Sequence, residues 1–564
     1  MARIAINTIA ANCQDCYRCV RECPVKAIRI TGGQAEIEED LCVECGTCAR
    51  ECPQKAKIIR SDLLEAKEIF ASGKTVVASV APSFAAMYPG PLGRRLPSAL
   101  RRLGFKLVSE TAEGAKYSAV KSFGDNPSGV CTACPAVVNF VEKHRPEFLD
   151  SLIPVVSPMI AHGRLLKSIF PGCQVIFIGP CAAKKQEIER PGNAGAIDLA
   201  LTFQEIDEWL HSEGIYLDDC SESSFDNFFE IGDARLFPLQ GGMLKTGNIP
   251  NSGTEEDIIH LSGPEDVISV FSGKNDLDGK VIEPLFCKGG CIGGPCFPSN
   301  GELVARRRSV IAYAKEAAKP PRLPRVSEIN FKASFVSEAK AEEPVSDNQI
   351  QKILERTGKV DPIFQLNCGA CGYNSCLENA IAVARGMAEP EMCIPYMRRL
   401  AQQRSDRIIE TTPNGIVILD NSLCMIKMNP AFQKMFMCST GILGRRVSYL
   451  VNAEGFEALQ TGSMEKYEAF RSKYSIRYHE ILYALREENQ YVGIYSDISK
   501  IRMDSGQLDV IKSQTLKHAQ EFLDHQVRFS QEMAHYLGKS TARSEEIAKR
   551  LISLFGSESD GLPK

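Results

Sequence analysis

Repeated cysteine spacing is the strongest constraint that this sequence places on its own fold. The segment 13–24 reads C-x2-C-x2-C-x3-C-P, and the segment 42–53 repeats that spacing. Sixteen of the 22 cysteines fall into four groups of four, and the two repeated runs contain eight of them. Cysteines at short fixed spacing, in a chain without a secretion signal, are typical of metal ligands in a reducing compartment and not of disulfides. We therefore expect the chain to fold so that these thiols converge on metal.

The doubled run has the spacing of two-cluster bacterial ferredoxins, in which the fourth cysteine of each run binds the cluster of the other run. This rule assigns Cys13, Cys16, Cys19 and Cys52 to one 4Fe–4S cluster, and Cys42, Cys45, Cys48 and Cys23 to the second. The other two groups are Cys134, Cys181, Cys287 and Cys291, and Cys368, Cys371, Cys376 and Cys393. On spacing alone, the group that begins at Cys134 is equally compatible with a shared cluster and with separate structural thiols. The spacing of the last group is too regular for free thiols, so we expect it to bind a 4Fe–4S cluster.

Composition narrows the class of protein. A formal net charge of −4 and the absence of a basic stripe argue against nucleic acid as a partner. No run of 18 uncharged apolar residues is present, so we expect no membrane span. The N-terminal segment MARIAINTIAANCQDC lacks the pattern of a signal peptide, and we expect a cytoplasmic protein.

The sequence divides into segments of different character, and it predicts a multidomain α/β protein. We expect a ferredoxin-like domain over 1–62 and an α/β core over 63–320, where short β-rich runs alternate with helical text. A segment rich in Pro, Ser and charge over 321–349 is typical of a linker. The remaining predicted parts are a small helical 4Fe–4S domain over 350–402, an α+β domain over 403–502, and helices with a tail over 503–564.

The predicted core resembles the catalytic domain of the iron–iron hydrogenases. Three segments carry the resemblance: TACP at 132–135, GPCAAKKQE at 179–187 and EPLFCKGGC at 283–291. The segments VASVAPSFAAM and GFKLVSETAEGAK match two further stretches of that family. The resemblance covers about half of the chain, and the three motifs together are specific. The resemblance implies an H-cluster, which is a 4Fe–4S cubane joined through one cysteine to a di-iron unit with CO and cyanide ligands.

The resemblance also implies roles for individual residues. The cubane ligands would be Cys134, Cys181, Cys287 and Cys291, with Cys291 as the bridge to the di-iron unit. Lys184, with Glu187 in the same motif, would bind a cyanide of that unit, since a fixed ammonium suits an anionic ligand. Pro82 and Ser83 match residues that line the pocket.

Several positions depart from the family pattern. Ala133 stands where productive members have a cysteine that passes protons to the site, and a methyl group neither donates nor accepts a proton. Ile153 and Met159 replace a serine and a glutamine, and Gly179 and Leu285 each replace a methionine. The loss of one positioned proton donor costs about 10² to 10⁴ in rate. We therefore expect slow turnover, which suits a sensor of hydrogen better than a producer, and the sensory branch of this family shows the same replacement by alanine.

The last third of the sequence fits that interpretation. The segment around Cys368 resembles the small 4Fe–4S module of corrinoid iron–sulfur proteins. From Ile408 the text resembles a PAS sensor domain, with Asn429 and Asp497 at two of its characteristic positions. The helices predicted after residue 503 lead to no kinase or phosphatase segment, so we expect signalling to a separate kinase or phosphatase. We also expect a homodimer, with a redox partner protein and hydrogen as its other partners.

Three functional hypotheses remain at this stage. The first is an H-cluster sensor of hydrogen or redox state that relays electrons through its 4Fe–4S clusters to the PAS module. The second is a working hydrogenase or electron-transfer oxidoreductase that interconverts protons, electrons and hydrogen. The third is an iron–sulfur protein without a di-iron unit, similar to the hydrogenase-like factors of cytosolic cluster assembly.

Overall fold

The computed structural model divides the chain into two compact units, Met1–Ile394 and Pro395–Lys564. The residues that it describes are 3–124, 128–229, 231–248, 257–272, 277, 279–298, 302–316, 329–341, 344–462, 464–486 and 488–499. Side chains 404 and 405 within a helix are not described. The helices and tail expected over 503–564 lie outside these ranges.

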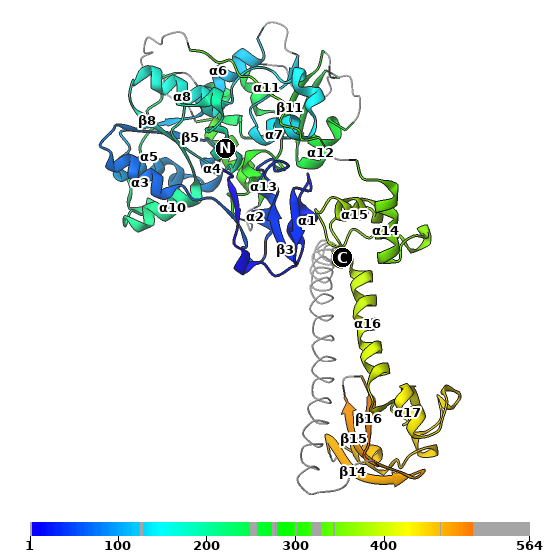
Figure 1. The fold of residues 1–564 in the computed structure, drawn as a ribbon. Coiled ribbons are helices and arrows are strands. Elements are labelled where there is room, and N and C mark those ends of the chain that lie inside the picture. Colours follow the sequence, from blue (N-terminus) through cyan, green and yellow to red (C-terminus); the bar gives the residue numbers. More distant parts are fainter. Residues whose placement is uncertain are drawn as a thin grey trace, which may run out of the picture. The chain divides into compact units, whose positions relative to one another are not determined.

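The first unit begins with a small domain built around the repeated cysteine runs (Figure 1). The strands β1 (Ile6–Thr8) and β4 (Lys57–Ile59) pair antiparallel, and so do β2 (Ile28–Thr31) and β3 (Gln34–Ile37). Each run leads into one short helix, α1 (Arg18–Glu22) or α2 (Thr47–Glu51). Gly46 precedes α2 with φ +74°, a conformation that glycine adopts without strain. The ferredoxin-type domain predicted from the spacing is confirmed.

A four-stranded parallel sheet, in the order β6-β5-β8-β9, forms the centre of the α/β core. Its strands are β5 (Val76–Val80), β6 (Leu107–Glu110), β8 (Gln174–Gly179) and β9 (Leu199–Thr202). All five residues of β5 are buried, as expected for a parallel strand that is covered on both faces. In the register, Val80 lies opposite Glu110 on one side and Ile178 on the other. The mixed α/β architecture predicted for this region is confirmed.

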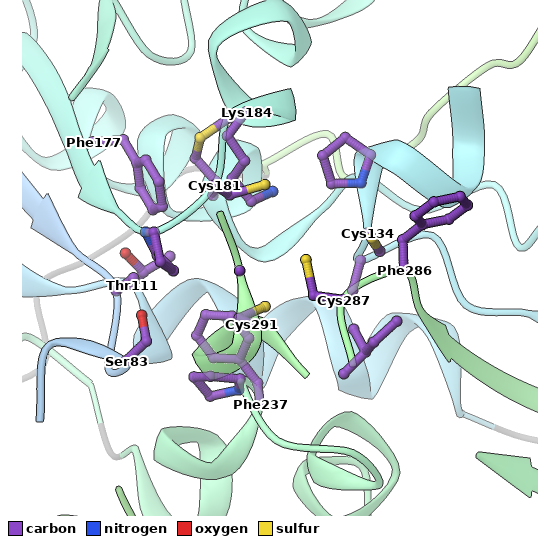
Figure 2. A pocket seen from close by; sticks show the side chains of 18 residues that line it. Ser83, Thr111, Cys134, Phe177, Cys181, Lys184, Phe237, Phe286, Cys287 and Cys291 are labelled. Atoms are coloured by element: carbon purple, nitrogen blue, oxygen red, sulfur yellow. The ribbon is translucent and has the colours of Figure 1, made fainter. Parts of the chain in front are cut away.

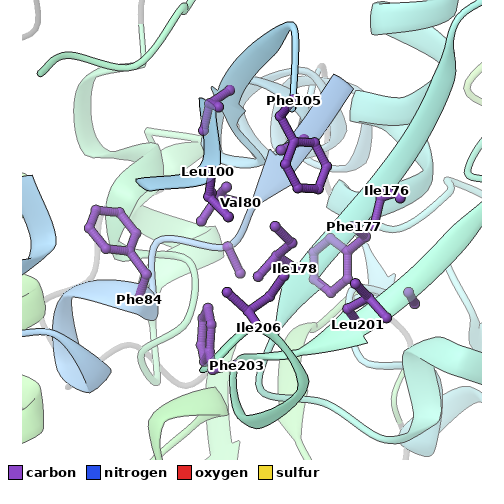
Figure 3. Packing of buried hydrophobic residues seen from close by; sticks show 14 of the residues in the cluster. Val80, Phe84, Leu100, Phe105, Ile176, Phe177, Ile178, Leu201, Phe203 and Ile206 are labelled. Atoms are coloured by element: carbon purple, nitrogen blue, oxygen red, sulfur yellow. The ribbon is translucent and has the colours of Figure 1, made fainter. Parts of the chain in front are cut away.

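Helices enclose this sheet and form its apolar core. The packing of Val80, Ile176 and Ile178 with Phe105, Leu201 and Phe203 is shown in Figure 3. Helix α8 packs on β5 and β8, and α6 packs on α8. The helices are α3 (Leu63–Ala71), α4 (Phe84–Met87), α5 (Pro91–Leu103), α6 (Ala112–Ser122), α7 (Pro135–His144), α8 (Pro158–Ile169), α9 (Ala183–Glu187), α10 (Phe203–Ser212), α11 (Gly242–Thr246), α12 (Pro264–Val270) and α13 (Leu303–Ala314).

A second parallel sheet completes the core. Its strands follow the order β10-β11-β7, with β7 at Gly129–Val130, β10 at Ile258–Ser262 and β11 at Val281–Leu285. The apolar side chains of α7 and α12 pack beside this sheet, with Phe140, Phe271 and Ile282 in one cluster. The two sheets point the carboxyl ends of β7, β8 and β11 toward one pocket, which the next subsection describes.

The segment that the sequence indicates as a linker is packed in its described part. Phe331 and Phe335 contact the core clusters, and the Phe331 carbonyl accepts a hydrogen bond from the Val156 N–H at 2.9 Å. A small helical module follows, with α14 (Asp347–Thr357) and α15 (Cys376–Ala384). A capping box of Ser346 and Gln349 starts α14, because each side chain binds the backbone N–H of the other residue.

The second unit is an α+β domain. Its antiparallel sheet has the order β13-β12-β16-β15-β14 over five strands. The strands are β12 (Gly415–Leu419), β13 (Met425–Met428), β14 (Lys466–Lys473), β15 (Ile476–Leu485) and β16 (Gln490–Asp497), and the helices are α16 (Ile394–Thr411), α17 (Pro430–Met435) and α18 (Glu454–Gln460). In the described part of the chain, no helix combines the length and the apolar character needed to cross a bilayer.

Candidate iron–sulfur and H-cluster site

The cysteines of the two repeated runs converge within the first domain. Four of them, Cys19, Cys23, Cys42 and Cys48, are buried in one cluster of side chains. Cys19 lies within electrostatic reach of Cys13, Cys16 and Cys52, so the first run meets the last cysteine of the second. Cys23 in turn interacts with Cys45, and Cys48 interacts with both of them. The structure thus brings together the two sets that the crossed ferredoxin pattern groups.

Backbone N–H groups surround these sulfur atoms. The N–H of Ala27 donates to Cys23 Sγ at 3.3 Å, and the N–H of Ala56 donates to Cys52 Sγ at 3.2 Å. Burial raises the pKa of Cys19 to about 11. A buried thiol with such a pKa carries no charge at neutral pH unless a metal displaces its proton, and N–H donors then stabilise the bound sulfur.

The four scattered cysteines line one pocket, although they lie far apart in the sequence (Figure 2). Cys134 caps α7 after β7, and Cys181 lies between β8 and α9. Cys287 and Cys291 follow β11. Pockets at the carboxyl ends of parallel strands are the usual ligand sites of α/β folds, because the loops that leave the strands converge there. Of the two possibilities left open by the spacing, the geometry favours one shared site.

Lys184 brings a positive charge into this pocket. Its side chain is buried, and Nζ donates to Glu187 Oε2 at 2.7 Å and to Ser157 Oγ at 3.3 Å. Burial acts to lower the pKa of Lys184, but Glu187 and Cys181 raise it, and the net direction is upward. The ammonium therefore stays charged, and Glu187 acts on the site through Lys184.

Ser83 is a second polar group at the pocket. It is completely buried before α4, and within the described ranges its Oγ has no hydrogen-bond partner. A buried hydroxyl without a partner is costly, and a polar ligand in the pocket would satisfy it. Pro82 precedes Ser83 but is not among the lining residues, whereas the methyl group of Ala133 is.

The positions that depart from the hydrogenase pattern give the pocket an apolar wall. Met159 and Leu285 line it, and Ile153 packs beside Ala133 outside the lining. At Gly179 a Cβ would lie 2.5 Å from the ring of Phe177, so this ring fills the space that a methionine would need. Cys131 is buried in the same cluster as Ala133 but does not line the pocket.

Several lining residues were not singled out by sequence reasoning. They are Thr111, Phe177, Phe237 and Phe286. Thr111 directly follows β6, and Phe177 lies within β8, so their places at the pocket become apparent only once the parallel sheet is known. Phe237 belongs to no regular motif.

The fourth group of cysteines lies around the start of α15. Cys371, Cys376 and Cys393 are buried, whereas Cys368 is exposed. Lys359, which the sequence did not single out, donates from Nζ to Cys376 Sγ at 3.1 Å. A cation of this kind stabilises anionic sulfur.

Three of the groups adjoin one another in the first unit. Cys45 of the ferredoxin-type domain shares a side-chain cluster with Cys134 and Cys181 of the pocket. On the other side, Cys23 shares a cluster with Cys371 and Tyr373 of the small helical module. The set assigned to the second ferredoxin-type cluster therefore lies between the pocket and the last group.

Among the described residues, no three His, Cys, Asp or Glu side chains are arranged to hold a single metal ion. In a 4Fe–4S cluster each cysteine binds a different iron, so such a cluster does not require three ligands on one ion.

Comparison with protein families supports this organisation. Residues 74–258 match the family "Iron only hydrogenase large subunit, C-terminal domain", and residues 12–57 match "4Fe-4S dicluster domain". Residues 365–395 match a short Fe-S cluster family. The three matches cover the pocket domain in part, the repeated runs and the last cysteine group.

Curated relatives come from cytosolic Fe-S cluster assembly. The factor NAR1 of Kluyveromyces lactis is 36% identical over 154 residues, which are 25% of this chain and 33% of that protein. The NAR1 factor of Encephalitozoon cuniculi is 26% identical over 188 residues, or 29% of this chain and 51% of that protein. The chain thus spans a third to a half of the length of these relatives.

Solved structures include FeFe-hydrogenase HydA1 from Chlamydomonas reinhardtii. It aligns with 50% of this chain and 100% of its own, at 18% identity and a TM-score of 0.38. A PAS domain of an HTR-like protein from Haloarcula marismortui aligns with 18% of this chain and 99% of its own, at 19% identity and a TM-score of 0.16.

Proposed function

This chain is a hydrogenase-like iron–sulfur protein, and we propose that it binds an H-cluster and senses hydrogen or redox state. The observation that carries this proposal is the pocket itself. Four cysteines line it together with the buried ammonium of Lys184 and the unsatisfied hydroxyl of Ser83. A cubane requires the thiols alone, so the two polar groups suit a further, anionic ligand.

The residues fit such a group. Cys134, Cys181, Cys287 and Cys291 would hold the cubane, with Cys291 shared with a di-iron unit, and Lys184 and Ser83 would face its cyanide ligands. When bound, the H-cluster supplies an open iron position for hydrogen and, with the other 4Fe–4S clusters, electron transfer.

The chain's own residues would then bind and orient the group. Glu187 and Ser157 hold the Lys184 ammonium by two hydrogen bonds, which leaves one N–H for a ligand in the pocket. Because the side chain is already fixed, ligand binding would cost little additional rotamer freedom. Met159, Phe177 and Leu285 exclude water from the pocket wall. A dry environment strengthens the attraction between the ammonium and an anionic ligand.

Slow turnover follows from Ala133. Its methyl group lines the pocket where a proton donor would be needed, and the buried thiol of Cys131 lies outside the lining. Burial raises the pKa of Cys131 to about 12, so this thiol is a weak acid. A site that binds hydrogen but transfers protons slowly suits detection better than production.

The second unit supports a role in signalling. Its five-stranded antiparallel sheet, with the two short helices α17 and α18, has the layout of a PAS domain. The Asn429 side chain links the start of the domain, because Oδ1 accepts the N–H groups of Ile416 and Phe432 at 2.7 and 2.9 Å. We infer that this unit responds to the state of the 4Fe–4S clusters and acts on a separate kinase or phosphatase, as a cytoplasmic homodimer supplied by a redox partner protein.

The curated relatives favour a second candidate function. They are cytosolic Fe-S cluster assembly factors, and the same four pocket cysteines could hold a cubane without a di-iron unit. On this alternative, Lys184 and Ser83 would have no anionic ligand to bind. The PAS-like unit argues against a third possibility, a hydrogenase built for turnover.

An infrared spectrum decides among these functions. The full chain is reconstituted anaerobically with iron and sulfide, a synthetic di-iron unit is added, and spectra are recorded under argon and under hydrogen. Carbonyl and cyanide bands that change with hydrogen, together with slow turnover, are the expected result. Fast turnover would indicate an enzyme, and the absence of bands would favour a cubane-only protein.

A further inference from the structure

A chain of buried hydroxyl, imidazole and carboxyl groups leads away from the pocket wall. It starts at Thr111, which lines the pocket, and continues through Ser79 and His162 to Ser109 and Glu113. All five side chains have 0% exposure. None of them lies in the three segments that contain the pocket cysteines, although all except His162 lie in the two further stretches, 77–87 and 104–116, that match the hydrogenase family.

The distances along this chain are those of hydrogen bonds. Ser79 Oγ lies 2.8 Å from Thr111 Oγ1 and 2.7 Å from His162 Nδ1. On the other side of the imidazole, His162 Nε2 lies 3.2 Å from Ser109 Oγ, which donates to Glu113 Oε2 at 2.5 Å. The chain is therefore continuous from a residue of the pocket wall to a carboxylate.

Strand register and a close approach of two helices bring these groups together. Ser79 and Ser109 are paired across β5 and β6, and His162 reaches them from α8. Helix α6 approaches α8 at Gly114, where a Cβ would lie 2.5 Å from the His162 backbone nitrogen. A side chain at position 114 would push the imidazole away from the two serines.

We propose that Thr111, Ser79, His162, Ser109 and Glu113 form a proton relay that leads from the pocket to the buried carboxylate of Glu113. This inference rests on the proposed hydrogen-binding function, and it gives a route to the slow proton transfer that is expected with Ala133. When His162 carries its proton on Nε2, each hydroxyl of the relay accepts a hydrogen bond from one neighbour and donates to the next. All the hydrogen bonds then point in one direction, from Thr111 to Glu113.

One proton moves through the relay in each passage, and no electron does. A proton that reaches Thr111 displaces the hydroxyl proton of Thr111 toward Ser79, and the Ser79 proton passes to His162 Nδ1. The imidazolium releases its Nε2 proton to Ser109, whose own proton passes to Glu113. Glu113 Oε2 also lies 3.4 Å from His162 Nε2, so the carboxylate stabilises the imidazolium while it exists.

The far end of the relay lies under a partly exposed segment. The backbone N–H groups of Phe228 and Phe229 donate to Glu113 Oε1, and Asn227 Oδ1 accepts from Ser109 Oγ at 3.3 Å. Asn227 is half-buried and also binds Glu110, which Arg235 neutralises. Glu113 is thus the terminal acceptor of the relay, and the segment 227–229 covers it.

The first test measures proton exchange without depending on the di-iron unit. The full cluster-loaded chain is labelled with ¹⁵N-histidine, the His162 signal is identified by its loss in His162→Gln, and exchange of its ring proton with ²H₂O is followed by ¹⁵N-detected NMR. Ser109→Ala should slow this exchange by about tenfold or more. Ser118→Ala is the matched control, since Ser118 is a buried serine that donates to the Val156 carbonyl outside the relay.

The second test uses the loaded site. Ser79→Ala should lower the rate of hydrogen–deuterium exchange between H₂ and ²H₂O by about tenfold. Ser79→Thr, which keeps a hydroxyl, and Ser118→Ala should retain the wild-type rate.

Equal ring-proton exchange in Ser109→Ala and Ser118→Ala would overturn the relay, as would a wild-type rate of hydrogen–deuterium exchange in Ser79→Ala. Carbonyl bands that ignore hydrogen would instead overturn the proposed function, and the NMR result would still decide the relay.

Discussion

The ferredoxin-type domain and the pocket domain both gather four-cysteine sets, but they do so in opposite ways. In the first, the ligands come from two runs within residues 12–57, and four of these cysteines belong to the buried cluster of side chains. In the second, Cys134, Cys181, Cys287 and Cys291 are brought together by loops after three parallel strands. Among the described residues, the large cluster around the four-stranded sheet contains none of these four cysteines and is built mainly from aliphatic and aromatic side chains.

This difference indicates which part depends on metal for its fold. A small domain with few apolar side chains relies on its clusters, because ligand binding contributes directly to folding. A domain with a large apolar core keeps its fold without the cofactor, so its pocket is free to carry additional polar groups. Lys184 and Ser83 are such groups.

The largest expected effect comes from the removal of one ligand in each region. Cys48→Ala should unfold residues 12–57, whereas Cys287→Ala should lose one cubane, or about four iron atoms, and keep its fold. Hydrogen exchange measured by mass spectrometry reports the folding, and iron analysis reports the cluster. Cys131→Ala, which removes a buried thiol outside the quartets, should change neither; loss of iron in that variant would contradict the comparison.

Two adjacent lysines of the pocket domain have different roles: Lys185 stabilises the fold, and Lys184 is expected to bind the ligand of the pocket. Lys185 Nζ lies 3.0 Å from Asp62 and 2.9 Å from Glu205, so Lys185→Met leaves the buried Glu205 carboxylate without a cation, whereas Asp62 keeps Arg60 at 2.7 Å. This variant should lose about 3–5 kcal/mol in the free energy of unfolding. Lys184→Met removes only the hydrogen bonds to Glu187 and Ser157, whereas Lys185→Met also removes one to the Ala200 carbonyl, so Lys184→Met should lose less stability. It should, however, weaken or shift the cyanide bands. Denaturant unfolding and infrared spectra check the two results, and equal destabilisation would contradict the assignment.

Two glycines test how the last cysteine group packs on the ferredoxin-type domain. Gly372 has φ +94°, and a Cβ there would lie 2.8 Å from Val20 Cγ1. Gly369 also has a positive φ, of +69°, but nothing lies closer than 4.0 Å. Gly369→Ala should cost about 1–2 kcal/mol from the backbone alone, and Gly372→Ala should cost more. Thermal unfolding measures the difference, and equal losses would show that the contact with Val20 relaxes freely.

The smallest effect concerns pH. Burial raises the pKa of Glu283 to about 7, against hydrogen bonds from the backbone N–H groups of Leu244 and Met243 that lower it. The folded state then binds a proton more tightly than the unfolded state, so the stabilisation is complete below the unfolded pKa and is lost as pH rises through 7. Between pH 6 and 8 the loss is about 1 kcal/mol.

Glu283→Gln should remove this dependence on pH. Denaturant unfolding of the pocket domain at pH 6, 7 and 8 measures it, and Glu265→Gln at an exposed position of α12 is the control. A wild-type protein whose stability is constant over that range would contradict the raised pKa.

The sequence by itself determined the features that depend on neighbours along the chain. The spacing of Cys13 to Cys52 predicted the ferredoxin-type domain, because each run must wrap its cluster locally. The alternation of β-rich and helical text predicted the mixed α/β core. The segment 321–349 shows the limit of such reasoning, since Phe331 and Phe335 pack on the core within a stretch whose composition indicates a linker.

Only the tertiary structure decided how distant residues combine. The spacing from Cys134 to Cys291 was equally compatible with a shared cluster and with separate thiols, and the convergence of three strand ends brought the four cysteines to one pocket. The same holds for Ser79, Ser109 and His162, which lie on two strands and a helix. A serine or a histidine in an apolar stretch says nothing about its partner, because hydrogen bonds between elements depend on register and helix approach. Local spacing therefore specifies the cluster domain, and packing across the sheet specifies the chemistry of the pocket.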